Sequence, residues 1–381
     1  MKYMLIAGEP SGDLHASRLI RALRRADKDA RFVFLGGDLM AAEALSEPHI
    51  HYRDMAFMGF SEVLRNLHKI SENLRNAKKI LANERPDALI LVDYPGFNLK
   101  MAKAAHGLSI PNYWYISPKL WAWKAWRVKS IRKYIRKVLC ILPFEPQWYV
   151  EHEYDRAVYV GNPTVEELRQ SISYAPDRAE FFAAKKLRNR PLIALLPGSR
   201  RGEIRCNLPV MDAVARQFPQ YTVAVAGAPG IPDDFYSGLT KFQIVRGATH
   251  SLLAHSHAAL VTSGTATLEA AVARVPQVVT YRSNGSKLAY NIMKRLLHVR
   301  FVSLPNLIVG RAVVPEMLLH FCTPESVADE LRKLTPEQAP RRLEMLAGYD
   351  DVAAILGAPG AAEKAASEII ADLKDLKIPR M

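Results

Sequence analysis

Short apolar runs alternate with longer amphipathic segments along the chain, and this alternation constrains the fold more than any other feature. Each run has the length of a buried strand, and segments such as residues 14–26 have helical periodicity. Strands separated by helices pair in parallel, so we expect two parallel α/β sheets. The expected strands are Tyr3–Ala7, Phe32–Leu35, Ala88–Val92, Asn112–Ile116, Val138–Ile141 and Ala157–Val160 in the first half, and Leu192–Leu196, Thr222–Ala226, Gln243–Val245, Ala258–Val261 and Gln277–Thr280 in the second.

The length and composition fit two globular domains. The chain has 381 residues, of which 49% are hydrophobic and 24% charged. A polar, proline-bounded stretch at 174–191 separates the two sets of strands, so we predict an N-terminal domain over 1–173 and a second over 174–345. The tail, 346–381, contains an amphipathic helix that could cap either domain or a partner chain.

The charge is strongly basic, with a formal net charge of +14. This excess favours an anionic partner: nucleic acid, a phosphorylated substrate or an anionic membrane surface. We expect no transmembrane helix, because no apolar run is long enough, and we interpret the N-terminus as a strand instead of a signal peptide. Cys140, Cys206 and Cys322 lack metal-site spacing, which suggests a reducing compartment and no metal site.

The segment Leu-Leu-Pro-Gly-Ser-Arg at 195–200 predicts a strand end, a tight turn and a helix that begins near Glu203. Ligands of open α/β sheets lie at the carboxyl ends of strands, where helix N-termini present free N–H groups. Gly198 and Ser199 would let an anion approach the backbone, and Arg200 could bind phosphate. The alternative is an ordinary turn with an exposed arginine.

A second strand end, after residue 261, has the same character. Small and hydroxyl residues open an alanine-rich helix there, and the carboxylate of Glu269 could accept hydrogen bonds from ribose or sugar hydroxyls. The alternative is an N-capping box, which the spacing does not fit well. Together the two turns favour a site for a nucleotide diphosphate. In the second turn the candidates are Ser263, Gly264, Thr265, Ala266, Thr267 and Glu269.

The first strand runs directly into Gly-Glu-Pro-Ser-Gly-Asp at 8–13. This turn lacks the G-x-G-x-x-G fingerprint, and its two acids would repel a pyrophosphate. We interpret it as a substrate-facing loop that includes Glu9, Ser11, Gly12 and Asp13, with a helix-capping turn as the alternative.

Asp93 follows a strong strand and begins the segment Asp-Tyr-Pro-Gly-Phe-Asn, which ends at Asn98. A carboxylate at the carboxyl end of a buried parallel strand could take a proton from a substrate hydroxyl. The alternative is a residue that caps the next helix or braces the Pro-Gly turn. We place Asn98 in the same substrate-facing region.

Two further segments suggest contact with an anionic or apolar surface. Residues 119–137 carry Lys and Arg but no acid, with Trp121, Trp123 and Trp126 between them, which suits a membrane surface, a phosphorylated substrate or single-stranded nucleic acid. The alternative is a solvated basic helix with its tryptophans in the core. The second segment has apolar residues at helical spacing, with basic residues beside them, so it suits either a core-facing or an interfacial helix. Its apolar residues are Phe60, Val63, Leu64, Leu67 and Ile70.

These motifs, in this order, resemble the lipid-A-disaccharide synthase family over the chain to about residue 320. The matching segments lie at 8–13, 58–64, 93–98, 115–118, 121–123, 142–145, 196–200, 263–269 and 302–306. Pro10 and Gly96 depart from the family's usual residues, but neither is assigned chemistry.

The resemblance implies a GT-B glycosyltransferase with two Rossmann-like domains facing a cleft and no tightly bound metal or other cofactor. It implies inverting transfer of 2,3-diacylglucosamine from its UDP ester to 2,3-diacylglucosamine 1-phosphate (lipid X), which gives a β-1,6-linked disaccharide and UDP. Arg200 and the helix start at 263–267 would stabilise the leaving diphosphate, Glu269 and Asn306 would hold the donor, and Asp93 would be the general base.

The resemblance also bears on location and assembly. The basic segment would attract the acceptor phosphate, and the apolar stripe at 60–70 would touch the anionic inner membrane, so we expect a cytoplasmic protein peripherally associated with that membrane. The tail helix would return to the first domain and help to build a swapped homodimer.

Two other functions remain open from the sequence. One is another UDP-sugar enzyme of the same fold, such as a soluble glycosyltransferase or an epimerase. The other is a nucleic-acid binder, which the charge and tryptophans suggest. It would leave Asp93, Glu269 and the two phosphate turns without a role, so we expect no nucleic-acid partner.

Overall fold

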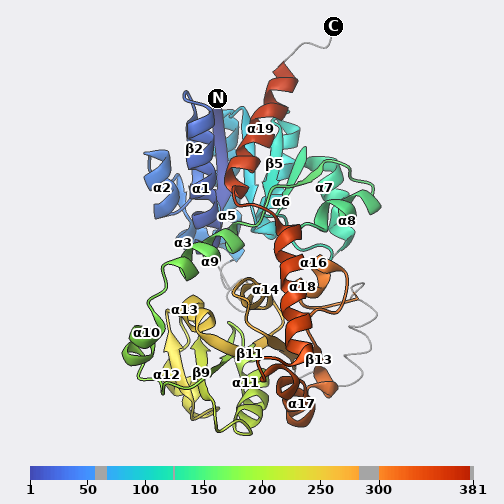
Figure 1. The fold of residues 1–381 in the computed structure, drawn as a ribbon. Coiled ribbons are helices and arrows are strands. Elements are labelled where there is room, and N and C mark those ends of the chain that lie inside the picture. The colour runs from blue at the N-terminus through green and yellow to red at the C-terminus, as the bar shows by residue number, and fades with distance from the viewer. Residues whose placement is uncertain (56–66, 123–124, 283–299, 378–381) are drawn as a thin grey trace. The chain divides into compact units, whose positions relative to one another are not determined.

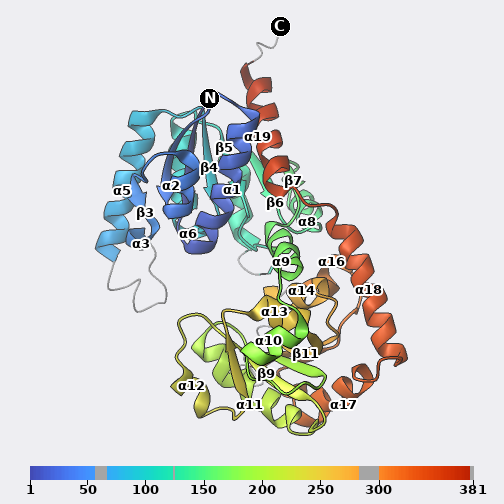
Figure 2. The ribbon, with the colours of Figure 1, turned by 60° about the vertical axis from the view of Figure 1, so that its left-hand side comes forward.

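The computed structural model describes residues 1–55, 67–122, 125–282 and 300–377, and the chain divides into two compact units (Figures 1 and 2). The first unit contains Met1–Pro163 and Ala358–Met381, and the second contains Thr164–Gly357. The chain therefore passes between the units at 163/164 and at 357/358, where the sequence suggested breaks after 173 and after 345. Each unit contains one parallel sheet with helices on both faces, which is the predicted α/β class.

The first unit contains a seven-stranded sheet in the order β3-β2-β1-β4-β5-β6-β7. The strands are β1 (Lys2–Ala7), β2 (Arg31–Gly36), β3 (Ile50–His51), β4 (Ala88–Val92), β5 (Asn112–Tyr115), β6 (Lys137–Cys140) and β7 (Ala157–Tyr159). The helices are α1 (Pro10–Ala26), α2 (Asp38–Ala44), α3 (Tyr52–Met55), α5 (Leu67–Glu84), α6 (Pro95–Gly107), α7 (Val128–Tyr134), α8 (Glu145–Glu151) and α19 (Ala361–Lys377). The sequence did not predict β3, because two residues are too few to show a pattern.

The central strands of this sheet are buried on both faces. Alternate side chains of β1 enter different cores: Met4 and Ile6 pack on one face, and Tyr3 and Leu5 on the other. This explains why the strand is continuously apolar instead of alternating. Helix α19, far away in sequence, packs beside α1 and adds Ile369 to the second core (Figure 1).

The second unit contains a six-stranded parallel sheet in the order β10-β9-β8-β11-β12-β13. The strands are β8 (Leu192–Leu196), β9 (Thr222–Gly227), β10 (Gln243–Arg246), β11 (Ser256–Thr262), β12 (Gln277–Tyr281) and β13 (Glu316–Leu318). The helices are α9 (Pro163–Ser173), α10 (Arg178–Ala184), α11 (Arg201–Ala215), α12 (Asp233–Ser237), α13 (Thr249–Ala254), α14 (Thr265–Val272), α16 (Leu304–Val309), α17 (Pro324–Leu334) and α18 (Pro340–Leu356). Only β13 was not predicted.

The strand order creates one switch point in each sheet. In the first unit the chain winds outward in opposite directions from β1 and β4, and in the second unit from β8 and β11. Ligands of doubly wound sheets bind at the carboxyl ends of the strands at such a point. The four segments predicted to bind substrate follow these four strands.

Candidate functional site

The first unit brings two predicted loops together at its switch point. Ala7 and Val92 are register partners at the carboxyl ends of β1 and β4, so the residues that follow them, including Glu9 and Asp93, emerge side by side. The carboxyl groups of Glu9 and Asp93 lie close enough together for Glu9 to raise the pKa of Asp93. The sequence did not pair these two acids, because their contact depends on strand order.

The backbone is strained at the same carboxyl ends of the strands. Asp93 and Tyr94 have φ angles of 44° and 46°, and Ile116, which follows β5, has φ 59°. Left-handed backbone is unfavourable for non-glycine residues and most of all for a β-branched one. Residues held in this way cluster at functional sites, so the strain supports a site at the ends of β4 and β5.

Neighbouring side chains hold this strained turn in place. The amide Nδ2 of Asn98 donates to the carbonyl oxygens of Val92 (3.3 Å) and Asp93 (2.7 Å). Gly8 faces the ring of Tyr94 so closely that a Cβ there would lie 2.4 Å from it. Asn98 is fully buried, and its Nδ2 braces the turn that carries Asp93. Its Oδ1 has no hydrogen-bond partner among the described residues, so a contact with substrate stays a prediction.

Asp93 has the properties of a general base. Burial, together with the charge and hydrogen bond of Glu9, raises the pKa of Asp93 to about 6, and the positive charge of Lys119 partly opposes this shift. A general base works best when its pKa lies near the operating pH. Asp93 can therefore be ionised at neutral pH and still accept a proton.

Glu145 is a buried carboxyl group to which the sequence analysis assigned no role. It is 1% exposed, and it accepts hydrogen bonds from the N–H groups of Ile141 (3.2 Å) and Leu142 (3.0 Å) and from the indole of Trp121 (3.1 Å). Burial raises the pKa of Glu145 to about 7. The sequence could have indicated Glu145 as a candidate site residue, because it is an acid just beyond the carboxyl end of β6.

The carboxylate of Asp13 is engaged by backbone donors. Its carboxylate accepts hydrogen bonds from the N–H groups of Gly37 (2.8 Å), Leu39 (3.1 Å) and Met40 (3.2 Å), and the residue is 3% exposed. Asp13 thus caps the N-terminus of α2, because both of its oxygens accept from backbone donors. The prediction that it contacts substrate gains no support from these contacts.

The other residues of that loop are placed differently. Gly12 is buried, and a Cβ there would lie 3.3 Å from the Cβ of Ala7, so Gly12 allows α1 to approach β1. Ser11 is exposed and donates a hydrogen bond to Glu9 (3.0 Å). Glu9 and Ser11 therefore remain the candidates for substrate contact.

The second unit repeats the arrangement. Leu196 and Val261 are register partners at the ends of β8 and β11, which brings the turns at 197–200 and 263–265 next to each other. Helices α11 and α14 begin at these turns (Figure 2). Two neighbouring helix N-termini form an electropositive region suited to an anion.

The turn before α11 is partly occupied by its own helix. The carboxylate of Glu203 accepts hydrogen bonds from the N–H groups of Ser199 (3.1 Å) and Arg200 (3.3 Å). Gly198 has φ 110°, and a Cβ there would lie 2.6 Å from Glu203. The close approach of Glu203 thus requires glycine at position 198. In this structure Glu203, and not an anion, accepts from these two N–H groups, and donor binding by this turn stays a prediction. The Arg200 side chain is 85% exposed and remains available.

The turn before α14 is more open. Gly264 and Thr265 are exposed, and the first N–H groups of a helix have no partners within it. Ala266 is half-buried beside them. Thr267 is fully buried; its hydroxyl donates to Gly264 (2.7 Å) and accepts from the N–H of Leu304 (3.2 Å), so its side chain holds the loop in place.

Ser263 and Glu269 flank this turn. The Ser263 hydroxyl donates to the carbonyl of Val302 (3.0 Å), which leaves its oxygen able to accept a further hydrogen bond. Burial raises the pKa of Glu269, the charge of His250 opposes this shift and that of Glu167 adds to it. Glu269 therefore lies close enough to His250 for the two side chains to interact.

Asn306 does not contact a donor site in this structure. Its Nδ2 donates to the carbonyl of Val314 and to Glu316, each at 2.9 Å, while its Oδ1 accepts from the N–H groups of Val313 (2.7 Å) and Val314 (2.9 Å). The residue is 1% exposed. All of its hydrogen-bonding groups serve the surrounding loop in this structure, so the contact with the donor stays a prediction that this arrangement does not support.

The basic segment 119–137 is divided between the two ends of the strands of the first sheet. Lys119 is exposed and lies close enough to Asp93 and Glu145 to lower both of their pKa values. Lys133 and Arg136 lie at the opposite end, where β5 and β6 begin. The segment is therefore not one continuous patch. Trp126 is 67% exposed, whereas the alternative interpretation of this segment placed its tryptophans in the core. Trp123 lies outside the described residues.

Most of the predicted apolar stripe cannot be placed. Phe60, Val63 and Leu64 lie outside the described residues, Leu67 is the first residue of α5, and Ile70 is half-buried in that helix. Within the described ranges no helix is long and apolar enough to cross a membrane. The same ranges contain no cluster of three or more His, Cys, Asp or Glu suited to a metal ion.

Comparison with known proteins identifies the family. The family model described as Lipid-A-disaccharide synthetase matches residues 3–348. The chain is 40% identical over 381 residues to the lipid-A-disaccharide synthase of Myxococcus xanthus (strain DK1622), which covers 97% of each chain. It is 36% identical over 355 residues, 90% of each chain, to that of Chromobacterium violaceum (strain ATCC 12472).

Solved structures show the same fold at low identity. The UDP-GlcNAc 2-epimerase of Neisseria meningitidis, bound to UDP-GlcNAc, has a TM-score of 0.65 at 14% identity and covers 99% of this chain and 100% of its own. The calicheamicin glycosyltransferase CalG4 has a TM-score of 0.58 at 17% identity, with 99% of each chain covered. The fold is thus that of GT-B glycosyltransferases and UDP-GlcNAc 2-epimerases. The sequence match shows more than the fold: the chain belongs to the lipid-A-disaccharide synthase family, glycosyltransferases of lipid A biosynthesis.

Proposed function

We propose that this chain transfers 2,3-diacylglucosamine from UDP-2,3-diacylglucosamine to the 6-hydroxyl of 2,3-diacylglucosamine 1-phosphate, with inversion at the transferred carbon. The products are a β-1,6-linked disaccharide 1-phosphate and UDP. The observation that carries the proposal is Asp93, held by a strained turn at the switch point beside Glu9, with its pKa raised to about 6.

Asp93 would act as the general base. Its carboxylate takes the proton of the acceptor 6-hydroxyl as that oxygen forms a bond to C1 of the donor sugar. The bond between C1 and the diphosphate oxygen breaks at the same time, and its electron pair leaves with UDP. Lys119, next to Asp93, supplies positive charge that could attract the 1-phosphate of the acceptor.

The second unit would bind the donor. The exposed guanidinium of Arg200 and the open N-terminus of α14 can neutralise the charge that develops on the leaving diphosphate. Ser263, Thr265 and Glu269 are the remaining polar groups around this turn, and Glu269 would accept hydrogen bonds from hydroxyls of the ribose or sugar.

The direct test is incubation of the purified protein with UDP-2,3-diacylglucosamine, with and without the monosaccharide 1-phosphate, followed by mass spectrometry of the lipid. Formation of the disaccharide 1-phosphate only when both substrates are present supports the proposal. NMR of the new glycosidic bond would show a β-anomer; an α-anomer would contradict the inverting mechanism.

A UDP-sugar epimerase is the second candidate, because epimerases share the fold. The same incubation distinguishes the two functions. An epimerase would change the donor sugar alone, without the acceptor, and would form no disaccharide.

We also propose that the protein associates peripherally with the anionic inner-membrane surface, where its acylated substrates reside, through the stripe that includes Leu67 and Ile70. Replacing Phe60 and Leu67 by serine should release it from vesicles of phosphatidylethanolamine and phosphatidylglycerol while its melting temperature is retained. A sharp fall in melting temperature would instead mark these residues as core.

The homodimer is likewise a proposal. In this structure α19 packs against α1 of its own chain. Sedimentation at several concentrations would show a dimer. Cross-linking of cysteines introduced in α1 and α19 would then show whether the helix is exchanged between chains.

A further inference from the structure

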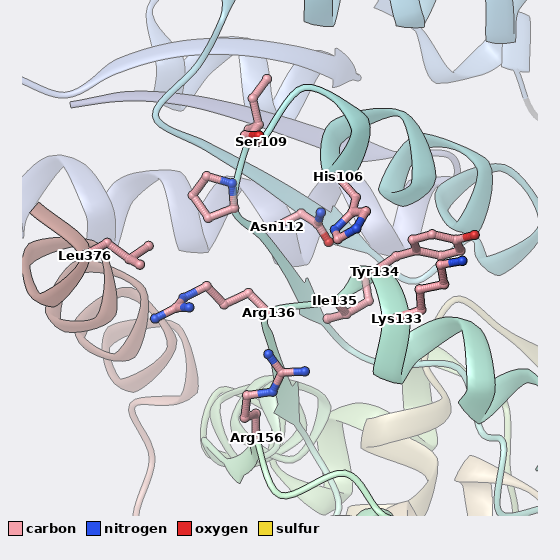
Figure 3. Close-up of a pocket in the computed structure, with 11 residues that line it drawn as sticks. His106, Ser109, Asn112, Lys133, Tyr134, Ile135, Arg136, Arg156 and Leu376 are labelled. Carbon is pink, nitrogen blue, oxygen red and sulfur yellow. The ribbon is translucent and has the colours of Figure 1, made fainter.

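A pocket of about 340 Å³ opens in the first unit at the N-terminal ends of the strands, whereas Asp93 lies at their carboxyl ends (Figure 3). It lies where β5, β6 and β7 begin, whereas Asp93 follows the end of β4. A four-residue strand such as β5 spans roughly 13 Å, so the pocket is separate from the proposed catalytic site. Its volume lies within the range of roughly 300–1,000 Å³ typical of small-molecule sites.

The pocket is lined by cations from three segments, as Figure 3 shows. Lys133 comes from the last turn of α7, Arg136 from the turn before β6, and Arg156 from the residue before β7. No acidic side chain lines it. The pocket therefore has the charge expected of an anion site.

Two of these cations are not neutralised by the protein. Arg136 is paired with Asp372 through hydrogen bonds of 2.6 and 3.0 Å. Lys133 instead lies over the ring of Tyr134, and Arg156 lies over Tyr154 and donates to the carbonyl of Arg132 (3.3 Å). Among the described residues no carboxylate is within ion-pair distance of Lys133 or Arg156.

The negative C-terminal ends of the neighbouring helices do not fully neutralise this positive charge. Helices α6 and α7 both end near the pocket, and each C-terminus contributes at most about −0.5 of a charge. The two ends therefore offset about one positive charge, while Lys133 and Arg156 carry two. A net positive charge of about one remains.

A buried acceptor in the pocket adds a second requirement. Asn112, the first residue of β5, lines the pocket and is 2% exposed. Its Nδ2 makes a long contact of 3.5 Å to the carbonyl of Ala102, but its Oδ1 has no hydrogen-bond partner. A buried acceptor without a partner is costly, so a fitting ligand would donate a hydrogen bond to it.

We infer that this pocket binds a phosphate group that carries or adjoins a hydroxyl donor, as in hydrogen phosphate, a polyol phosphate or the head group of a glycerophospholipid. Lys133 and Arg156 supply the positive charge that attracts the phosphate, and the hydroxyl donates to Oδ1 of Asn112. The site does not depend on the proposed transferase activity, because none of its residues belongs to that site.

The test is calorimetric titration of the full chain with inorganic phosphate and with glycerol 3-phosphate at constant ionic strength. An Arg200→Ala host removes the cation of the proposed diphosphate site. In this host, Lys133→Ala with Arg156→Ala should weaken binding at least about tenfold, because two charge-assisted contacts are lost. The control is Lys28→Ala with Arg31→Ala, which removes the same charges from exposed positions of the same unit and should change affinity less than about twofold.

The Asn112 acceptor is tested with sulfate, which carries no O–H at neutral pH. Asn112→Leu should weaken phosphate binding roughly threefold to tenfold and leave sulfate binding unchanged. An equal effect on both anions would overturn the role of Asn112. Absence of saturable phosphate binding, together with no vesicle binding that depends on Lys133 and Arg156, would overturn the site.

Vesicles distinguish the two sources of the phosphate group. If the ligand is a lipid head group, the variant with Lys133→Ala and Arg156→Ala should bind phosphatidylglycerol vesicles more weakly than the control variant. Neither variant should bind phosphatidylcholine vesicles. If the ligand is a soluble phosphate ester, glycerol 3-phosphate should bind, and the two variants should bind vesicles equally. Equal behaviour of the two variants in every arm would contradict the inference.

Discussion

Arg136 and Asp372 form a two-pronged ion pair that joins the last helix of the chain to the first sheet. The Nε and Nη2 atoms of Arg136 lie 2.6 and 3.0 Å from the carboxylate oxygens of Asp372, and the hydroxyl of Tyr113 donates to the same carboxylate at 2.6 Å. A second pair, Lys137 and Glu368 (2.9 Å), lies one helical turn earlier. Since Asp372 is 13% exposed, solvent screens its pair only partly.

Asp372→Ala should lower the stability of the first unit. Loss of these hydrogen bonds should cost about 2 kcal/mol, which corresponds to a fall of roughly 4–8 °C in melting temperature. Asp375→Ala, an exposed acid on the same helix, is the matched control and should change little. Equal melting of the two variants would show that the pair contributes nothing measurable.

The same pair predicts a pH dependence. Burial favours protonation of Asp372, but the hydrogen bonds from Arg136 and Tyr113 outweigh it and hold its pKa below the usual value. A depressed pKa stabilises the folded state above the unfolded pKa, and this contribution is lost as pH falls through the folded pKa. The difference in unfolding free energy between the parent and Asp372→Ala should therefore shrink as the pH is lowered below about 4.

Asp93→Asn should lower turnover about a hundredfold or more, the usual effect of losing a general base. UDP affinity should stay nearly unchanged, because the proposed donor residues belong to the other unit. Single-turnover kinetics and UDP titration measure the two effects. Retained turnover with a lowered melting temperature would mean that Asp93 only braces the turn, and Glu9 would become the candidate base.

The acid limb of the pH–rate profile tests the environment of Asp93. The base must be ionised, so kcat/KM should fall as pH drops through about 6, the raised pKa of Asp93. Glu9→Gln removes a charge that raises this pKa and should move the limb to lower pH. Lys119→Ala removes a charge that lowers it and should move the limb to higher pH. Shifts in the same direction would contradict the assignment.

Arg200→Ala should slow transfer about a hundredfold or more while the fold is retained, since loss of a group that stabilises developing charge typically costs about 3–4 kcal/mol. Arg205→Ala is the control, because Arg205 is exposed one turn further along α11 and lies beside Phe235. Similar rates for the two variants would remove Arg200 from the proposed site.

Asn306→Ala and Glu269→Gln should have opposite signatures. Asn306 satisfies two buried N–H groups, so its loss should lower stability by about 2–3 kcal/mol and leave donor affinity per folded molecule unchanged. Glu269→Gln should weaken donor binding with little change in melting temperature. Thermal unfolding and donor titration separate these roles, and the reverse pattern would restore Asn306 to the donor site.

The fold class could be predicted from the sequence alone, and so could the strand ends at which we propose that ligands bind. Eleven apolar runs became strands near their expected bounds, because an apolar stretch between helices is buried on both faces wherever it lies in the sheet. For the same reason Asp93, Arg200 and Glu269 were predicted from their positions after strands or helix starts.

Which polar side chains are left for a ligand depends on the packing of the whole fold. Asp13 and Asn306 follow the same residue patterns as the proposed site residues, yet each accepts hydrogen bonds from backbone N–H groups. Asn98 binds backbone carbonyls through its Nδ2, while its Oδ1 has no partner among the described residues. The contact of Glu9 with Asp93 depends on the pairing of β1 with β4. The contact of Arg136 with Asp372 depends on the packing of α19 in the first unit. Hydrogen bonds are short-range and directional, so local sequence shows that a polar group is present, but the packed fold determines its partner.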